Sequence, residues 1–168
     1  MEAPWCGLQA PEVDLACLVK YVKDNRIGML YEFGSGVSTQ RLAEAGVSVV
    51  SFETHKPYAD AVREYFKELR LDPMPTISSY EESSDFMSSL KHLAKARLCF
   101  VDGPRGTKQM SRINSLKAAA ILADTILLHD AQRRGERQSL EYMKGQGWNV
   151  SYLPGAVKPK KIALLVRA

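Results

Sequence analysis

The sequence predicts an α/β fold: a three-layer sandwich in which helices cover both faces of a seven-stranded, mostly parallel sheet. Short apolar segments alternate with longer segments of helical periodicity along most of the chain, and each parallel connection between strands needs a covering helix. Several apolar segments, such as residues 126–128, contain no polar position, which is typical of strands buried on both faces. Only residues 154–161 separate the last two apolar segments, so we expect these two strands to form an antiparallel hairpin that closes the sheet.

Six segments carry apolar residues three or four positions apart, which is the spacing of an amphipathic helix. The first of them has Leu15, Leu18 and Val22 on one face, and Gly46 is placed to end the second. The expected helices cover residues 11–24, 38–45, 58–71, 83–95, 108–123 and 133–146.

Seven shorter segments are rich in aliphatic and aromatic residues and lack helical spacing, which predicts strands. The first ends in glycines, and the third is the weakest because Ile77 is its only large apolar residue. The expected strands cover residues 29–33, 47–52, 76–79, 97–101, 125–128, 148–153 and 162–166.

Composition and length are those of an ordinary globular domain. The chain has 168 residues, of which 45% are hydrophobic and 25% are charged, and this excludes the disordered, fibrous and collagen-like classes. A chain of this length is typical of one domain. We therefore expect a single domain over residues 1–168, with an N-terminal helical segment at 1–27 and a core at 28–168.

The sequence favours a cytoplasmic protein with no membrane segment. No apolar run reaches the roughly 18 residues of a spanning helix, and the N-terminus has no basic region followed by an apolar core. The three cysteines, Cys6, Cys17 and Cys99, form no CxxC pair, which indicates free thiols in a reducing compartment.

The charge is mildly basic, with 23 Lys and Arg residues against 19 Asp and Glu residues and a formal net charge of +4. Two local clusters stand out: Arg133, Arg134 and Arg137, and Lys158, Lys160 and Lys161. The ordinary interpretation of both is solvated surface. The alternative is attraction of an anionic substrate, such as a phosphate, a uronate or a nucleic acid.

A glycine-rich loop at residues 31–39, Tyr-Glu-Phe-Gly-Ser-Gly-Val-Ser-Thr, joins the first strand to the second helix. Gly34 and Gly36 permit a tight turn and a close approach of the backbone to a ligand. A dinucleotide-binding loop has a third glycine where this chain has Thr39. The loop therefore disfavours a nicotinamide or flavin cofactor.

Two acidic residues lie at the ends of the first two predicted strands, close to the glycines of this loop. Glu32 precedes the first glycine and is placed to accept a hydrogen bond from an ammonium group. Glu53 ends the second strand, seventeen residues after Gly36, where an acidic side chain can bind both hydroxyls of a ribose.

These residues resemble the motifs of class I S-adenosylmethionine-dependent methyltransferases. The family's acid-x-Gly-x-Gly motif is matched by Glu32, Gly34 and Gly36, and its acid at the end of the second strand by Glu53. The resemblance implies a Rossmann-like sheet with a terminal antiparallel hairpin and S-adenosylmethionine as the cofactor. The cofactor-binding residues that it implies are Glu32, Gly34, Ser35, Gly36, Ser38, Thr39, Glu53, Thr54 and Asp102.

Polar side chains also follow the fourth and fifth strands. Asp102 comes after one of them, and His129 and Asp130 come after the other. Since ligands bind at the carboxyl ends of strands in such sheets, we expect the three side chains to converge as the catalytic group. They can act as a base toward an acceptor hydroxyl, or Asp102 and Asp130 can hold a divalent cation. Catechol-type methyltransferases, which use a metal, have Asn where this chain has Ala131.

A narrower resemblance is to the plant glucuronoxylan 4-O-methyltransferase family. It rests on segments 101–106 (Val-Asp-Gly-Pro-Arg-Gly), 110–113 (Met-Ser-Arg-Ile) and 128–133 (Leu-His-Asp-Ala-Gln-Arg). It implies an anionic group on the acceptor, bound by Arg105, Arg112 and Arg133. Arginine suits that role because its planar guanidinium pairs with carboxylates.

The sequence thus predicts an O-directed S-adenosylmethionine-dependent methyltransferase, with a small-molecule or saccharide acceptor favoured over nucleic acid. Two alternatives stay open. One is a non-catalytic module that binds an adenosyl cofactor or a partner, since a fold alone does not give activity. The other is an NAD-dependent oxidoreductase.

Overall fold

The structure is a computed structural model that describes residues 2–5, 12–104, 112–154 and 162–168. The helices are α1 (Glu12–Asp24), α2 (Val37–Glu44), α3 (Lys56–Leu69), α4 (Ser84–Leu90), α5 (Ile113–Leu122) and α6 (Arg134–Gly145). The strands are β1 (Met29–Phe33), β2 (Ser48–Glu53), β3 (Thr76–Ser79), β4 (Cys99–Val101), β5 (Thr125–Leu128), β6 (Trp148–Tyr152) and β7 (Ala163–Arg167).

All seven strands belong to one sheet with the order β3-β2-β1-β4-β5-β7-β6. The first five run parallel to one another, and β7 lies antiparallel between β5 and β6. This confirms the predicted fold class, including the antiparallel C-terminal pair. The order reverses between β1 and β4, which places the ends of these two strands and of β2 and β5 along one edge of the sheet.

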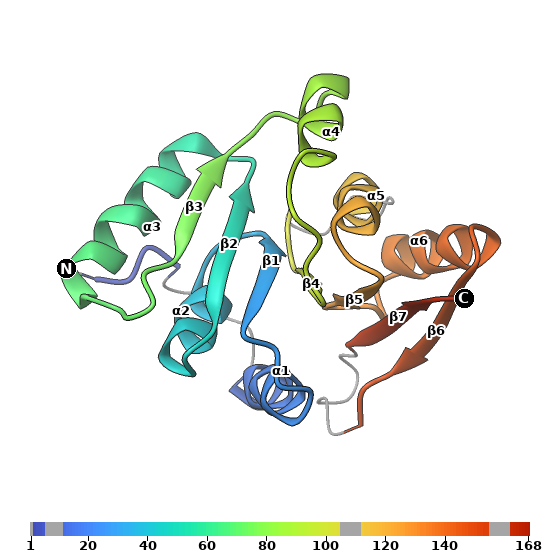
Figure 1. Ribbon diagram of the computed structural model, residues 1–168, viewed down its shortest axis with the longest axis horizontal. Helices are drawn as coiled ribbons and strands as arrows, with labels where there is room; N and C mark the ends of the chain where they lie inside the picture. The colour runs from blue at the N-terminus through green and yellow to red at the C-terminus, as the bar shows by residue number, and fades with distance from the viewer. Residues whose placement is uncertain (1, 6–11, 105–111, 155–161) are drawn as a thin grey trace.

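Helices cover both faces of the sheet (Figure 1), with α1, α2 and α3 on one side and α4, α5 and α6 on the other. The central strands alternate their side chains between two apolar clusters: Leu30 and Phe100 face the α1–α2 side, whereas Phe33 and Val101 face the α5–α6 side. Because both faces are buried, these strands have the continuous apolar sequence that identified them.

The segments before β1 belong to the same packing. Trp5 is 4% exposed and its ring lies 5.0 Å from that of Tyr65 and 5.7 Å from that of Phe66. In α1, Leu18 and Val22 join the cluster around Leu30. The helical segment that precedes the core is therefore anchored against it.

Among the described residues, the predicted boundaries that differ from the structure do so by one or two positions, except at the end of the fourth helix. The helix expected at 83–95 ends at Leu90. The residues after it form hydrogen bonds to the carbonyl three positions earlier instead of four, as from Leu93 N to Leu90 O (3.1 Å). In addition, Tyr31 Oη donates to the carbonyl of Ala94 (2.9 Å). The strand expected at 97–101 begins at Cys99. The first residues of the helix expected at 108–123 lie outside the described part of the chain.

None of the described helices is both long and apolar enough to cross a membrane. Of the three cysteines, Cys17 and Cys99 are free thiols, and Cys6 lies outside the described residues.

Candidate active site

The loop after β1 and the loop after β4 touch backbone to backbone. Phe33 O accepts hydrogen bonds from Asp102 N (2.9 Å) and Gly103 N (2.6 Å). Gly34 has a φ of +95°, and a Cβ placed on it would lie 2.6 Å from Gly103 N. Gly103 is equally restricted, since a Cβ there would lie 2.6 Å from Gly34 Cα. Both glycines are therefore required for the two loops to meet.

Glu32 lies fully buried beneath the glycine loop and accepts two hydrogen bonds from it. Ser38 Oγ donates to one carboxylate oxygen (2.6 Å) and Thr39 Oγ1 donates to the other. Thr39 Oγ1 in turn accepts from Gly36 N (2.9 Å). Burial raises the pKa of Glu32 to about 7, although the two hydroxyl donors lower it. The side chains of Glu32, Ser38 and Thr39 thus hold the backbone of the glycine loop in place from its buried side.

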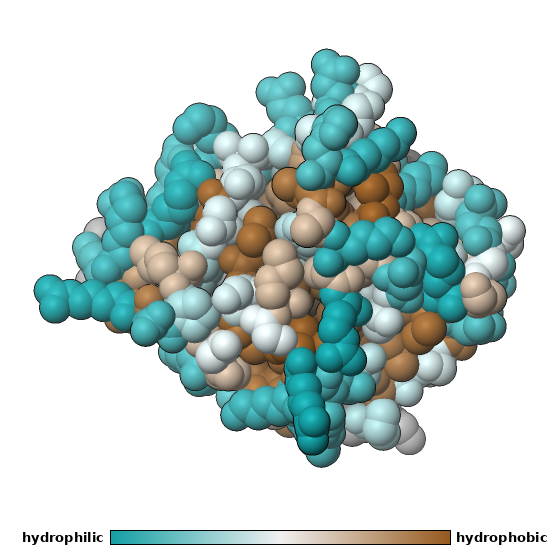
Figure 2. Space-filling model, viewed as in Figure 1, coloured by the Kyte–Doolittle hydropathy of each residue, from teal (hydrophilic) through white to brown (hydrophobic). Residues whose placement is uncertain are grey.

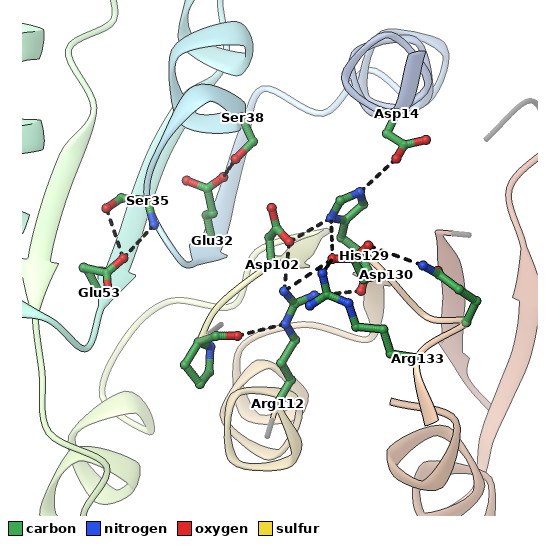
Figure 3. A network of polar contacts seen from close by, with 12 residues as sticks. Asp14, Glu32, Ser35, Ser38, Glu53, Asp102, Arg112, His129, Asp130 and Arg133 are labelled. Atoms are coloured by element: carbon green, nitrogen blue, oxygen red, sulfur yellow. Dashed lines mark hydrogen bonds and ion pairs between the residues drawn. The ribbon is translucent and has the colours of Figure 1, made fainter. Parts of the chain in front are cut away.

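Glu53, at the end of β2, reaches across to the same loop (Figure 3). Its Oε2 accepts from Ser35 N (3.2 Å) and lies 3.4 Å from Ser35 Oγ. Its Oε1 accepts from His55 N (3.0 Å) and lies 3.4 Å from the hydroxyl of the exposed Thr54. Glu53 is half-buried, so the carboxylate borders the solvent-facing side of the loop.

Tyr58 was missed by the sequence reasoning. Its hydroxyl oxygen would lie 3.3 Å from a Cβ placed on Gly36, so the phenol covers the glycine loop from α3. Burial, and then the charges of Glu53, Glu32 and Asp102, raise the pKa of Tyr58. The hydroxyl thus stays protonated and available as a hydrogen-bond donor.

The second group of polar side chains centres on His129, which bridges two carboxylates (Figure 3). Its Nδ1 lies 2.8 Å from Asp102 Oδ1 and its Nε2 lies 3.0 Å from Asp14 Oδ2. His129 and Asp14 are 3% and 2% exposed. Since carboxylates only accept hydrogen bonds, both ring nitrogens donate and the imidazole carries a positive charge.

The electrostatics agree with a charged ring. Burial alone would lower the pKa of His129, but the hydrogen bond to Asp102, the charges of Asp102 and Asp130, and the bond to Asp14 raise it to about 9. Burial likewise acts to raise the pKa of Asp102, yet His129 and two arginine charges hold it below its ordinary value.

Asp14 was also missed, although a signal was present. It stands four residues before Leu18 and eight before Val22, and at 3.6 residues per turn these positions share a helix face. A carboxylate on the apolar face of α1 indicates a buried partner. The partner, His129, lies 115 residues away in the chain.

Arg112, just before α5, is enclosed in the network. Its Nε donates to Pro104 O (3.0 Å), one terminal nitrogen donates to His129 O (2.8 Å), and the other lies 3.2 Å from Asp102 Oδ1. The side chain is only 3% exposed. All of its nitrogens thus face the protein interior. This differs from the expected role of Arg112, in which the guanidinium would be exposed to bind an acceptor.

Asp130 and Arg133 complete the group. Asp130 has a φ of 56°, the left-handed region, which Asp tolerates better than most residues. Its Oδ2 lies 2.6 Å from Arg133, 3.7 Å from His129 Nδ1 and 3.8 Å from Arg112. The Arg133 side chain is 37% exposed, so one side of its guanidinium is open to solvent.

The structure therefore brings Asp102, His129 and Asp130 together, as predicted from the strand ends. Asp102 is the most open of the three, with a side chain that is 25% exposed. Its Oδ1 takes the contacts with His129 and Arg112, and no hydrogen bond to its Oδ2 is found among the described residues. Arg105 lies outside the described part of the chain.

A cavity of about 250 Å³ opens between α4 and α5. Apolar side chains reach the surface there and hydrophilic ones surround them (Figure 2). One wall is the ring of Tyr80, which stacks on that of Phe86 with centroids 4.0 Å apart. Tyr80 follows β3, which is the parallel neighbour of β2, so Tyr80 lies at the same end of the sheet as Glu53.

Comparison of the sequence with protein-family models and with curated proteins finds no match. Solved structures do match over nearly the whole chain. An O-methyltransferase from Bacillus cereus in complex with SAH has a TM-score of 0.76 at 16% identity, with 95% of this chain and 83% of that chain covered. The O-methyltransferase TomG from Streptomyces achromogenes, involved in tomaymycin synthesis and in complex with SAM, has a TM-score of 0.72 at 14% identity, covering 98% and 86%.

A third structure, the SAH-bound methyltransferase PaMTH1 from Podospora anserina, has a TM-score of 0.69 at 17% identity, covering 95% and 80%. At such low identities the likeness concerns the fold. The chain has the Rossmann-like fold of class I S-adenosylmethionine-dependent methyltransferases, which its glycine loop and strand-end acids had suggested.

Proposed function

We propose that the protein is an S-adenosylmethionine-dependent O-methyltransferase. The observation that carries this proposal is the meeting of two constellations at one edge of the sheet. The glycine loop and Glu53 lie at the ends of β1 and β2, and the Asp102 group lies at the ends of β4 and β5, with the Gly34–Gly103 contact between them. Loops at such a switch in strand order are the usual ligand site of this kind of sheet.

The first constellation is assigned to the cofactor. The backbone of Gly34, Ser35 and Gly36 lies where the methionine end of S-adenosylmethionine would approach, and Glu53 would accept hydrogen bonds from the ribose. Thr54 and the cavity beside Tyr80 are assigned to the adenine side. Glu32, Ser38 and Thr39 lie beneath the loop and hold its shape.

The second constellation is assigned to the acceptor. When bound, the cofactor would supply an electrophilic methyl group for transfer to an acceptor oxygen. Asp102 would orient that acceptor and take its hydroxyl proton through Oδ2, while His129 and Arg112 hold Oδ1. General-base assistance typically contributes about 10²–10⁴-fold in rate, and the lowered pKa of Asp102 puts its contribution at the lower end of that range, with orientation of the acceptor as its larger role.

In this arrangement His129 is a positioning residue rather than the base, because both of its nitrogens already donate. Arg112 is likewise a positioning residue. One side of the Arg133 guanidinium is open to solvent, and we assign it to an anionic group on a small acceptor such as a uronate.

A screen with methyl-labelled cofactor over uronates, phenols, nucleotides and RNA would identify the acceptor. Labelling of RNA alone would contradict the small-molecule assignment.

Replacing Glu53 by glutamine is expected to weaken binding of S-adenosylhomocysteine by about 10–100-fold. The change removes the charge from hydrogen bonds to the ribose, and a hydrogen bond to a charged group is worth about 1.5–3 kcal/mol. Calorimetric titration measures it. Glu64→Gln, at an exposed ion pair on α3, is the matched control and should bind as wild type does. Equal affinities for the two variants would contradict the assignment of Glu53.

A further inference from the structure

The acidic group at the ends of β4 and β5 has the spacing of a metal site. Asp102, His129 and Asp130 each offer one ligand atom, and these atoms lie within 4.8 Å of one another. Two carboxylates that converge in this way suit a divalent cation such as Mg²⁺. Whether this chain has such a site depends on what already neutralises the two carboxylates.

Arg112 lies between them. One of its terminal nitrogens is 3.2 Å from Asp102 Oδ1 and 3.8 Å from Asp130 Oδ2. Its other nitrogens donate to the carbonyls of Pro104 and His129 at 3.0 and 2.8 Å, so the guanidinium is fixed in this position. Because a guanidinium does not lose its proton in proteins, a positive charge stays between the two acids.

The neighbouring donors are engaged as well. His129 directs Nδ1 to Asp102 and Nε2 to Asp14, so neither nitrogen has a lone pair free for a metal. Arg133 pairs with Asp130 Oδ2 at 2.6 Å. The three carboxylates of Asp14, Asp102 and Asp130 are thus balanced by three cations within the protein, and a divalent cation does not fit this donor set.

We propose that Arg112 is a built-in counter-cation that takes the place of a divalent metal between Asp102 and Asp130. It holds Asp102 ionised and oriented, and the site needs no metal for that purpose. The consequence for methyl transfer rests on the function proposed above, whereas the placement of Arg112 does not. Without the guanidinium, Asp102 keeps His129 and Asp130 keeps Arg133, but the space between the two carboxylates loses its cation. Removing Arg112 should therefore open that space to a divalent cation that the wild type does not bind.

The test is a thermal melt of the wild type and of Arg112→Met, each with and without Mn²⁺. A ligand that binds only the folded state raises the Tm. We expect Mn²⁺ to raise the Tm of Arg112→Met, or to refold it if it is unfolded without metal, and to leave the wild type unchanged. The added mutation Asp130→Asn removes the charge of one proposed ligand and should reduce Mn²⁺ affinity by more than the about 10–100-fold that loss of an outer-shell partner costs.

Arg41→Met is the matched control, because Arg41 also lies between two carboxylates, Glu12 and Glu44, but at the surface. It should show no response to Mn²⁺. A wild-type protein stabilised by Mn²⁺, with the effect lost in Asp130→Asn, would overturn the proposal. So would an Arg112→Met variant that does not respond to Mn²⁺ or stays unfolded in it. Binding of S-adenosylhomocysteine by the wild type, measured in parallel, tests the proposed function separately.

Discussion

Replacing His129 by glutamine is expected to destabilise the protein by about 3–5 kcal/mol. The imidazolium lies between the buried carboxylate of Asp14 and that of Asp102, at 3.0 and 2.8 Å. Glutamine fills similar space but carries no charge, so the buried Asp14 loses this cation and Asp102 keeps Arg112 but loses its closer partner. Removing one partner of a buried ion pair typically costs this much.

Thermal denaturation measures the loss. For a chain of this size the expected decrease in Tm is on the order of 10 °C. His92→Gln is the control, since His92 is exposed on the turn after α4, and it should melt as wild type does. Equal melting temperatures for His129→Gln and the wild type would show that the bridge between α1 and the strand ends contributes nothing.

The same bridge predicts how stability depends on pH. The pKa of His129 is raised from 6.5 to about 9 by its carboxylate partners, so the folded state holds this proton more tightly than the unfolded state. The stabilisation is complete below about pH 6.5 and is lost as the pH rises through about 9. We therefore expect the wild-type free energy of unfolding to fall between these values, and the fall to be absent in His129→Gln. A slope that persists unchanged in the variant would assign the titration to another group.

Replacing Gly34 by alanine is expected to abolish binding of S-adenosylhomocysteine and to destabilise the fold. The new Cβ would lie 2.6 Å from Gly103 N and 2.7 Å from Gly103 Cα, and backbone cannot move aside as a flexible side chain can. The φ of +95° adds strain of about 1–3 kcal/mol for a residue with a Cβ. Separation of the two loops would displace both the glycine loop and Asp102.

Gly46→Ala separates these effects. Gly46 also has a positive φ, +82°, but a Cβ there meets nothing within 4 Å. This variant should lose only the strain energy and keep wild-type affinity for S-adenosylhomocysteine in a calorimetric titration. If Gly34→Ala binds S-adenosylhomocysteine as tightly as Gly46→Ala does, the contact with Gly103 does not shape the proposed binding site.

The fold could be predicted from the sequence because its signals are local. A strand buried on both faces has a continuous apolar sequence, as in β5, and an amphipathic helix has a repeated spacing, as in α3. The end of α4 was missed because it depends on tertiary contacts, such as the hydrogen bond from Tyr31 to Ala94. The spacing of apolar residues in the sequence does not predict such contacts.

The site was predicted where topology alone decides it. Strands β4 and β5 are neighbours, so residues that follow them must meet, and Asp102 and His129 do. The roles of these side chains depend on partners distant in the chain. Asp14, on α1, accepts a hydrogen bond from His129 and so favours the charged form of the ring. Arg112 was expected to bind substrate, but its side chain is buried and pairs with Asp102 inside the protein. Neither burial nor pairing at such separations follows from a pattern of residue types.

We propose that the glycine loop and Glu53 bind an adenosyl cofactor for methyl transfer. Isothermal titration of the wild-type protein with S-adenosylhomocysteine and, separately, with NAD⁺ tests it most directly. We expect micromolar binding of one S-adenosylhomocysteine per chain, lost in Gly34→Ala, and no binding of NAD⁺. Binding of NAD⁺ without binding of S-adenosylhomocysteine would contradict it.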